Sequence, residues 1–127
     1  MRKPVLYDQD ASRDRIVWKI SSMETDSTIT ARGVVPVESA WFDGHFPGAP
    51  ILPGVAQLAM VEDILKEALG RIVTVTRLGR VRFKSIIHPG DNVTVEIKPK
   101  SGVPLTYTFQ ILCGNESASG GVITVAE

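Results

Sequence analysis

Apolar and polar residues alternate along the first part of the chain in a way that is typical of β-strands. Residues 16–23 and 27–37 are rich in β-branched side chains, and the turn-like Glu24-Thr25-Asp26 separates them. These two segments therefore predict a β-hairpin, whose second strand Gly33 and Pro36 loosen.

The pattern changes to a helical period over residues 55–69. Pro53 just before this segment and Gly70 just after it are both favoured at helix ends. At 100° per residue, the apolar side chains fill one broad arc of the helix. The members of that arc are Leu58, Met60, Val61, Ile64, Leu65, Ala68 and Leu69. The polar Gln57 also falls inside the arc, whereas Glu62, Asp63, Lys66 and Glu67 occupy the remainder.

Strand-like alternation resumes after Gly70 and continues to the end of the chain. Turn-forming residues at 88–91, 101–102 and 114–115 divide this part into four segments, 72–87, 92–98, 105–112 and 117–126. We interpret the four segments as a long antiparallel meander. One helix between a hairpin and a meander predicts an α+β fold, in which a curved antiparallel sheet wraps around a long central helix.

Residues 38–54 follow neither period. Glycines and prolines exclude regular structure there, yet the apolar Trp41, Phe42, Phe46, Ile51 and Leu52 are interleaved among them. Solvated loops are rarely so apolar, so we expect this segment to be packed and conformationally fixed, as functional loops often are.

The length of 127 residues fits one domain, 1–127, in which the polar residues 1–15 form a loosely ordered arm. Hydrophobic residues make up 43% of the chain and charged residues 22%, as in soluble globular proteins. The start of the chain lacks the apolar segment of a signal peptide, and no run approaches the roughly 20 apolar residues that cross a bilayer. We therefore expect a cytoplasmic protein without a membrane partner.

Fourteen basic residues balance fourteen acidic ones, so net charge gives no indication of a nucleic-acid partner. A local cluster of cations nevertheless occupies one stretch, formed by Arg71, Arg77, Arg80, Arg82 and Lys84. We interpret it as the solvated face of a strand. The alternative is a docking surface for an acidic carrier protein.

Cysteine chemistry is limited to Cys113, which excludes an intrachain disulfide and leaves no cysteine-based metal site. Because it follows the apolar residues 109–112, we expect a buried and unreactive thiol. No group of side chains indicates a metal, and we expect no cofactor.

The residues from His45 to Val55 read His-Phe-Pro-Gly-Ala-Pro-Ile-Leu-Pro-Gly-Val. This segment resembles the signature loop of the hotdog-fold 3-hydroxyacyl-carrier-protein dehydratases of fatty-acid synthesis. Weaker similarity extends to Val81-Arg82-Phe83-Lys84, to His88-Pro89-Gly90-Asp91 and to residues 119–122. Residues 50–58 are similar to the subgroup associated with aryl-polyene biosynthesis. The resemblance implies a hotdog fold and a dehydratase that acts on 3-hydroxyacyl thioesters.

Dehydration of such a thioester needs a base whose pKa is near neutrality, and histidine is suited to that task. The enolate oxygen needs preorganised donors, which the free amides of a helix N-terminus provide. The resemblance assigns the base to His45 and the carbonyl donor to the amide of Gly54. We expect the acyl-thioester site to be lined by Phe46, Pro47, Gly48, Ile51, Leu52, Pro53 and Val55. His88, in a turn, is expected to be a surface residue.

These dehydratases carry a carboxylate fourteen residues after the histidine, on the central helix of the neighbouring subunit, as the acid that protonates the leaving hydroxyl. Ala59 occupies that position here. Three alternatives remain open. Glu62 replaces the acid from one turn further on, although it also suits a surface pair with Lys66. Gln57 orients the hydroxyl or a water, or forms a structural hydrogen bond. His45 acts alone.

The leading functional hypothesis is thus a dehydratase for carrier-protein-bound 3-hydroxyacyl thioesters in fatty-acid or polyene-type biosynthesis. A hotdog thioesterase that uses Glu62 or Asp63 is the second hypothesis. The third is a non-catalytic acyl-binding subunit, which the alanine at position 59 favours. In every case the resemblance implies a homodimer or a higher oligomer, with the site shared between chains.

Overall fold

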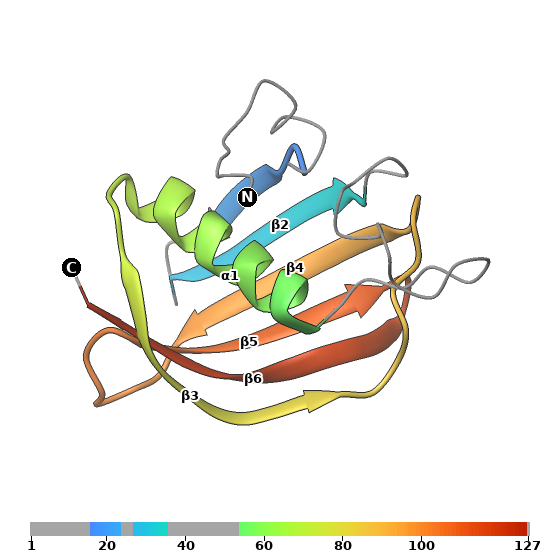
Figure 1. Ribbon diagram of the computed structural model, residues 1–127. Helices are drawn as coiled ribbons and strands as arrows, with labels where there is room; N and C mark the ends of the chain where they lie inside the picture. The colour runs from blue at the N-terminus through green and yellow to red at the C-terminus, as the bar shows by residue number, and fades with distance from the viewer. Residues whose placement is uncertain (1–15, 24–26, 36–53, 127) are drawn as a thin grey trace, which may run out of the picture.

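The computed structural model describes residues 16–23, 27–35 and 54–126. Within this part of the chain, one α-helix lies across a face of a six-stranded antiparallel sheet that curves around it (Figure 1). The predicted α+β fold with a central helix is confirmed. The predicted N-terminal arm and the loop 38–53 lie outside the described residues.

The strands follow the alternating segments of the sequence, with shorter ends. They are β1 Lys19–Met23, β2 Thr28–Val34, β3 Thr74–Phe83, β4 Asn92–Pro99, β5 Thr106–Cys113 and β6 Glu116–Ala126. The strands β1 and β2 form the predicted antiparallel hairpin.

The order of the strands across the sheet is β1-β2-β4-β5-β6-β3. The meander prediction is correct for β4, β5 and β6 but wrong for β3, which lies at the far edge beside β6, while β4 pairs with β2. Side-chain alternation determines which face of a strand is buried, but it does not determine which neighbour the strand has. The sequence pattern therefore left the place of β3 undetermined.

Helix α1 spans Gly54–Leu69 and starts one residue earlier than predicted. Its buried residues are Ala56, Gln57, Met60, Val61, Ile64 and Leu65, so the predicted apolar arc does face the sheet. Ala68 is exposed, in contrast to the prediction. Helical phase gives the apolar side of a helix, whereas tertiary packing decides how far along the axis the sheet covers that side.

The core lies between α1 and the inner face of the sheet, by which we mean the face toward the helix. Cross-strand partners share a face, and the row Ala31–Val95–Ile111 is fully buried on this side. Complete burial of one valine or isoleucine contributes roughly 1.5–3 kcal/mol relative to its exposed state. The outer face, opposite the helix, carries the polar partners of these strands.

Candidate active site

The N-terminus of α1 is the first component of the candidate site. The helix begins at Gly54, and its first turn carries no acidic side chain. The first amide groups of an α-helix have no acceptor within the helix and carry its positive dipole end. Such amides are suited to stabilise an oxygen atom on which negative charge develops during a reaction.

The ring of Phe83 lies directly against this helix start. A Cβ atom added at Gly54 would lie 2.8 Å from Cζ of Phe83 and 3.1 Å from Cε1 and Cε2. The phenylalanine side chain occupies the space that a side chain at position 54 would need. A side chain at position 54 would displace the ring, so the glycine permits this close approach.

The end of β3 that carries this ring is held to β6 by backbone hydrogen bonds. The amides of Lys84 and Ser85 both donate to the carbonyl of Ala118, at 2.7 and 3.1 Å. Phe83 is the cross-strand partner of Ser119, so both side chains project toward the helix side of the sheet. The ring is 51% exposed, although it touches α1.

Ser119 is fully buried at 0% exposure. Its Oγ has no hydrogen-bond partner within the described residues. Because it shares a register position with Phe83, this hydroxyl lies on the inner face close to the ring at the helix start. Sequence analysis singled out neither residue for function. The sequence signal that could have pointed to Phe83 is its position as an aromatic residue between two cations, Arg82 and Lys84.

The helix places the predicted polar residues on two different sides. Gln57 is only 4% exposed and faces the sheet, as its position in the apolar arc predicted. Ala59 and Glu62 are half-buried, and Val55, one turn before Ala59, is 63% exposed. Glu62 therefore shares the more accessible side of α1 with Ala59, whereas Gln57 belongs to the core side.

The expected surface pair between Glu62 and Lys66 is not formed. Both side chains lie within the described part of α1, and no ion pair joins them there. The carboxylate of Glu62 is thus not neutralised by the lysine one turn further along the helix.

Most of the predicted loop residues lie outside the described residues. This group comprises His45, Phe46, Pro47, Gly48, Ile51, Leu52 and Pro53. Of the predicted site, the structure describes Gly54, Val55, Gln57 and Glu62, all of them on α1.

The sequence analysis also considered His88 and Cys113, and the structure describes both. The side chain of His88 is 58% exposed, as predicted, with its Nδ1 3.7 Å from Oδ2 of Asp91. Cys113 is half-buried rather than buried. Partial burial, together with the charges of Asp91 and Glu116, raises the pKa of the Cys113 thiol above its ordinary value. Fewer Cys113 side chains are therefore in the reactive thiolate form near neutral pH.

The described residues contain neither a cluster of metal-binding side chains nor a membrane-spanning helix. No cluster of His, Cys, Asp and Glu side chains there is arranged to hold a metal ion. No described helix is long and apolar enough to cross a membrane.

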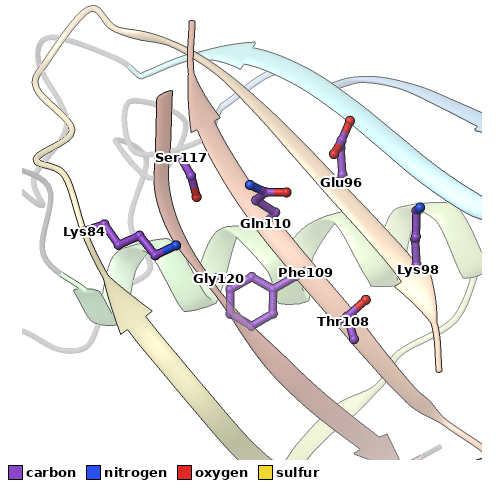
Figure 2. Close-up of a pocket in the computed structure, with 8 residues that line it drawn as sticks. All are labelled: Lys84, Glu96, Lys98, Thr108, Phe109, Gln110, Ser117 and Gly120. Carbon is purple, nitrogen blue, oxygen red and sulfur yellow. The ribbon is translucent and has the colours of Figure 1, made fainter. Parts of the chain in front are cut away.

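The outer face of the sheet carries a hollow of about 300 Å³ whose floor is Gly120 (Figure 2). Lys84, Glu96 and Lys98 project around it, together with Gln110. This hollow lies on the opposite side of the sheet from α1, so it is separate from the site at the helix start.

Comparison with known proteins identifies the family of the chain. The family model described as ApeI-like, ApeI dehydratase, matches residues 21–121. The chain belongs to the ApeI-like dehydratase family. The predicted resemblance to the aryl-polyene subgroup is confirmed by this match.

Curated relatives of this ApeI-like chain are dehydratases. It is 32% identical over 120 residues to the 3-hydroxyacyl-(acyl-carrier-protein) dehydratase FabZ of Hydrogenobaculum sp., covering 87% of this chain and 79% of that protein. It is also 32% identical over 90 residues to the FabZ of Chloroflexus aggregans. That match covers 65% of this chain and 62% of the relative, so it spans less than two thirds of the Chloroflexus protein.

The fold of the ApeI-like chain is also found in a solved structure. The dehydratase heterocomplex ApeI:P from Xenorhabdus doucetiae matches with a TM-score of 0.77 and 23% identity, over 89% of this chain and 99% of that one. The hotdog prediction is confirmed: one helix packs against a six-stranded antiparallel sheet, as in this neighbour.

Proposed function

We propose that the protein is a dehydratase that removes water from 3-hydroxyacyl thioesters carried on an acyl carrier protein, in fatty-acid or polyene-type biosynthesis. Membership of the ApeI-like dehydratase family and the FabZ relatives support this proposal. The observation that carries it is the start of α1 at Gly54, the residue at which the signature segment runs into the helix. We also propose that the reaction takes place in the cytoplasm.

In the proposed reaction His45 takes a proton from the carbon next to the thioester carbonyl. The electron pair of that C–H bond moves toward the carbonyl, whose oxygen accepts a hydrogen bond from the Gly54 amide. The C–O bond to the 3-hydroxyl then breaks, the hydroxyl leaves as water with an added proton, and a 2-enoyl thioester remains. Positioned acid–base groups of this kind contribute roughly 10²–10⁴-fold.

The residues of the signature loop would line the acyl-thioester site together with the helix start. They are Phe46, Pro47, Gly48, Ile51, Leu52, Pro53 and Val55. Val55 is exposed beside the proposed carbonyl donor, which is consistent with contact to a substrate or to a second subunit.

The source of the proton for the leaving hydroxyl is proposed to be Glu62. Its half-buried carboxylate lies on the same side of α1 as Ala59, about 4.5 Å further along the axis, and forms no pair with Lys66. Gln57 is proposed to orient the reacting groups from the core side, because its amide is buried against the sheet.

We also propose that the working unit is at least a dimer that joins the β3 edges of two chains. An edge strand presents unpaired backbone groups that another strand can pair. Apolar side chains are exposed along this side, with Leu78 at 44%, Phe83 at 51% and Ile72 at 81%. Sedimentation equilibrium tests this directly: a monomer at working concentration would contradict a site shared between chains.

The decisive assay follows hydration of short and medium 2-enoyl thioesters through the loss of the conjugated-enoyl absorbance. We expect activity in the wild type and its loss in His45→Ala, with Glu62→Gln slower by at least tenfold. Gln57→Asn, which shortens the amide without adding a charge, serves as the matched change on the core side. A wild-type protein inactive toward every 2-enoyl thioester would refute the dehydratase.

A thioesterase is the second candidate, and the accessible carboxylate of Glu62 is the observation that favours it. Release of free thiol from an acyl-CoA, lost in Glu62→Gln or Asp63→Asn, would support hydrolysis over dehydration.

A non-catalytic acyl-binding subunit is the third candidate. Ala59 favours it, and the structural neighbour from Xenorhabdus doucetiae is described as a heterocomplex. Tight binding of an acyl thioester without turnover, followed by activity on addition of a second chain that supplies a carboxylate, would support this role.

A further inference from the structure

One cross-strand row crosses the inner face of the sheet and ends against the start of α1. The register takes one side chain from each of β2, β4, β5, β6 and β3, and cross-strand partners share a face. In that order the members of the row are Ala31, Val95, Ile111, Ser119 and Phe83. Ser119 is thus the single polar side chain in a row of apolar ones.

Burial changes abruptly between the last two members of this row. The first four members are 0% exposed, whereas Phe83 is 51% exposed. Phe83 belongs to β3, which lies at the edge of the sheet, and α1 begins over this edge (Figure 1). Ser119 therefore lies at the boundary between the closed core and the more open edge where the helix starts.

The hydroxyl of Ser119 is completely buried, yet it has no hydrogen-bond partner in the described residues. Buried polar groups are nearly always hydrogen-bonded, because losing water without gaining another partner is unfavourable. The side chains on either side in the row, Ile111 and Phe83, contain no donor or acceptor. A hydroxyl proton can rotate about the C–O bond, so it remains available to an oxygen that enters this space.

Another buried hydroxyl of the same sheet, that of Thr106, is fully provided with partners. Its Oγ1 lies 3.1 Å from the carbonyl oxygen of Pro104 and 3.1 Å from Oγ1 of Thr124. Thr106 is 5% exposed and lies on β5, about 17 Å from Ile111 at roughly 3.4 Å per residue. Burial in this sheet therefore does not in itself leave a hydroxyl without a partner.

The ring of Phe83 connects Ser119 with the helix start. Directly paired residues have Cβ atoms about 4.5–5.5 Å apart, and Phe83 is the direct partner of Ser119. The same ring lies 2.8 Å from the position of a Cβ at Gly54, whose amide is among those without an acceptor inside the helix. The hydroxyl and the first amides of α1 therefore both border the space beside this ring.

From this arrangement we propose that Ser119 is a second hydrogen-bond donor to the thioester carbonyl, acting together with the amide of Gly54. The inference rests on the proposed dehydratase function and deepens it by adding a residue of the sheet to the site. The carbonyl oxygen accepts a hydrogen bond from each group, while the half-exposed ring of Phe83 moves aside.

The hydroxyl of Ser119 keeps its proton throughout the proposed reaction. As the proton leaves the carbon next to the carbonyl, negative charge develops on the carbonyl oxygen, and both hydrogen bonds become stronger. Such a bond contributes more to the transition state than to substrate binding. Retention of an unpartnered hydroxyl in the core then has a functional reason, since an alanine at position 119 would favour folding.

The test compares Ser119→Ala with Thr106→Val, which also removes a buried hydroxyl from the sheet. We expect Ser119→Ala to lower kcat for hydration of crotonyl-pantetheine roughly 10²-fold, with a smaller change in KM, as loss of one oxyanion donor does. The same variant should unfold at a higher urea concentration than the wild type, because an unpartnered polar group is removed. Thr106→Val should do the reverse, with unchanged kcat and a lower unfolding midpoint, because it breaks existing hydrogen bonds.

Ser119→Cys tests whether the donor or the size of the side chain matters. A thiol is a weak hydrogen-bond donor, so this variant should be nearly as slow as Ser119→Ala. Wild-type kcat in Ser119→Cys would overturn the proposal, and so would a marked loss of stability in Ser119→Ala, which would show that the hydroxyl is already bonded in the free protein.

The infrared band of a bound thioester carbonyl reports the proposed hydrogen bond directly. The probe is butyryl-pantetheine with an isotope label at the carbonyl carbon, which lacks the double bond needed for hydration. On the wild type its carbonyl stretching band should lie at a lower frequency than on Ser119→Ala, because hydrogen bonds polarise the C=O bond. Thr106→Val should give the wild-type band. Identical bands on the wild type and Ser119→Ala would overturn the proposal, whatever the effect on kcat.

The same probe separates failure of this inference from failure of the proposed function. If the wild type hydrates no 2-enoyl thioester, the dehydratase proposal fails, yet a band shift that depends on Ser119 would still support the carbonyl donor. If the wild type hydrates crotonyl-pantetheine and Ser119→Ala is equally fast with the same band, the dehydratase stands and the role of Ser119 is overturned. A wild type that neither binds butyryl-pantetheine nor hydrates the crotonyl thioester would overturn both.

Discussion

The contact between the helix start and Phe83 can be tested with Gly54→Ala. The added Cβ would lie 2.8 Å from Cζ of the ring, whereas carbon atoms are most stable at about 3.5–4.0 Å, so the ring must move by about 0.7 Å or more. Overpacking of this kind costs about 1–3 kcal/mol, and the ring's 51% exposure favours the lower end. Gly54 has no positive φ, so alanine there also recovers about 0.4–1 kcal/mol by lowering the conformational entropy of the unfolded chain.

These two effects nearly cancel in the single variant, so a double-mutant cycle is the informative measurement. In Phe83→Ala the obstacle is gone, and Gly54→Ala should then increase the free energy of unfolding rather than leave it unchanged or lower it. We expect a coupling free energy of about 1–2 kcal/mol between the two positions. Urea unfolding of the four proteins at one fixed concentration measures it, since association alters apparent stability.

The control cycle replaces Phe83→Ala by Leu78→Ala. Leu78 lies on the same strand and the same face and is 44% exposed, but it is not among the atoms nearest to a Cβ at position 54. Its cycle with Gly54→Ala should be additive. Additivity within about 0.3–0.5 kcal/mol in the Phe83 cycle as well would refute the contact.

Three further predictions concern the sheet. Gly121→Ala should destabilise the protein by about 1–3 kcal/mol, because its Cβ would lie 3.0 Å from Cα of Val81, whereas Gly79→Ala, with nothing within 4 Å, should be nearly neutral in the same urea series. Ser119→Ala should stabilise the fold by about 1 kcal/mol, because it removes a buried hydroxyl without a partner in the described residues, and a marked loss of stability would show that the hydroxyl is bonded. Alkylation of Cys113 by iodoacetamide should be slower than in the urea-unfolded chain near neutral pH, and its rate should rise with a midpoint above the ordinary thiol value, since the folded-state pKa is raised.

Local sequence signals predicted the helix well because several of them agree. A helical apolar period, a proline before the segment and Gly70 after it gave an end at Leu69 and a start within one residue of Gly54. Gln57 was also predicted to be buried, because its angular position on the helix falls within the apolar arc. Each of these inferences depends on residues that are near one another in the chain.

The place of β3 and the role of Phe83 depend on contacts between distant segments. Nothing in the alternation of β3 distinguishes β6 from β4 as its neighbour, since each strand has buried residues at alternate positions along part of its length. The contact between Phe83 and Gly54 joins residues 29 positions apart and follows only once β3 occupies the edge beside β6. The cations on the outer face of the sheet come together for the same reason, because Lys100, just after β4, lines the same hollow as Arg77 and Arg80 of β3.

The geometry of α1 narrows the search for the acid that Ala59 does not provide. Counted from Gly54 at 100° per residue, Val55, Ala59 and Glu62 fall at about 100°, 140° and 80°, whereas Gln57 falls at about 300°. The observed exposures agree, since Gln57 is buried against the sheet and the other three are not. A side chain of α1 that takes the place of a carboxylate at position 59 needs the accessible side of the helix, where Glu62 lies. The alternative that His45 acts alone concerns a residue outside the described part of the chain. Gln57 is buried on the core side, so we propose it as an orienting group and not as the proton donor.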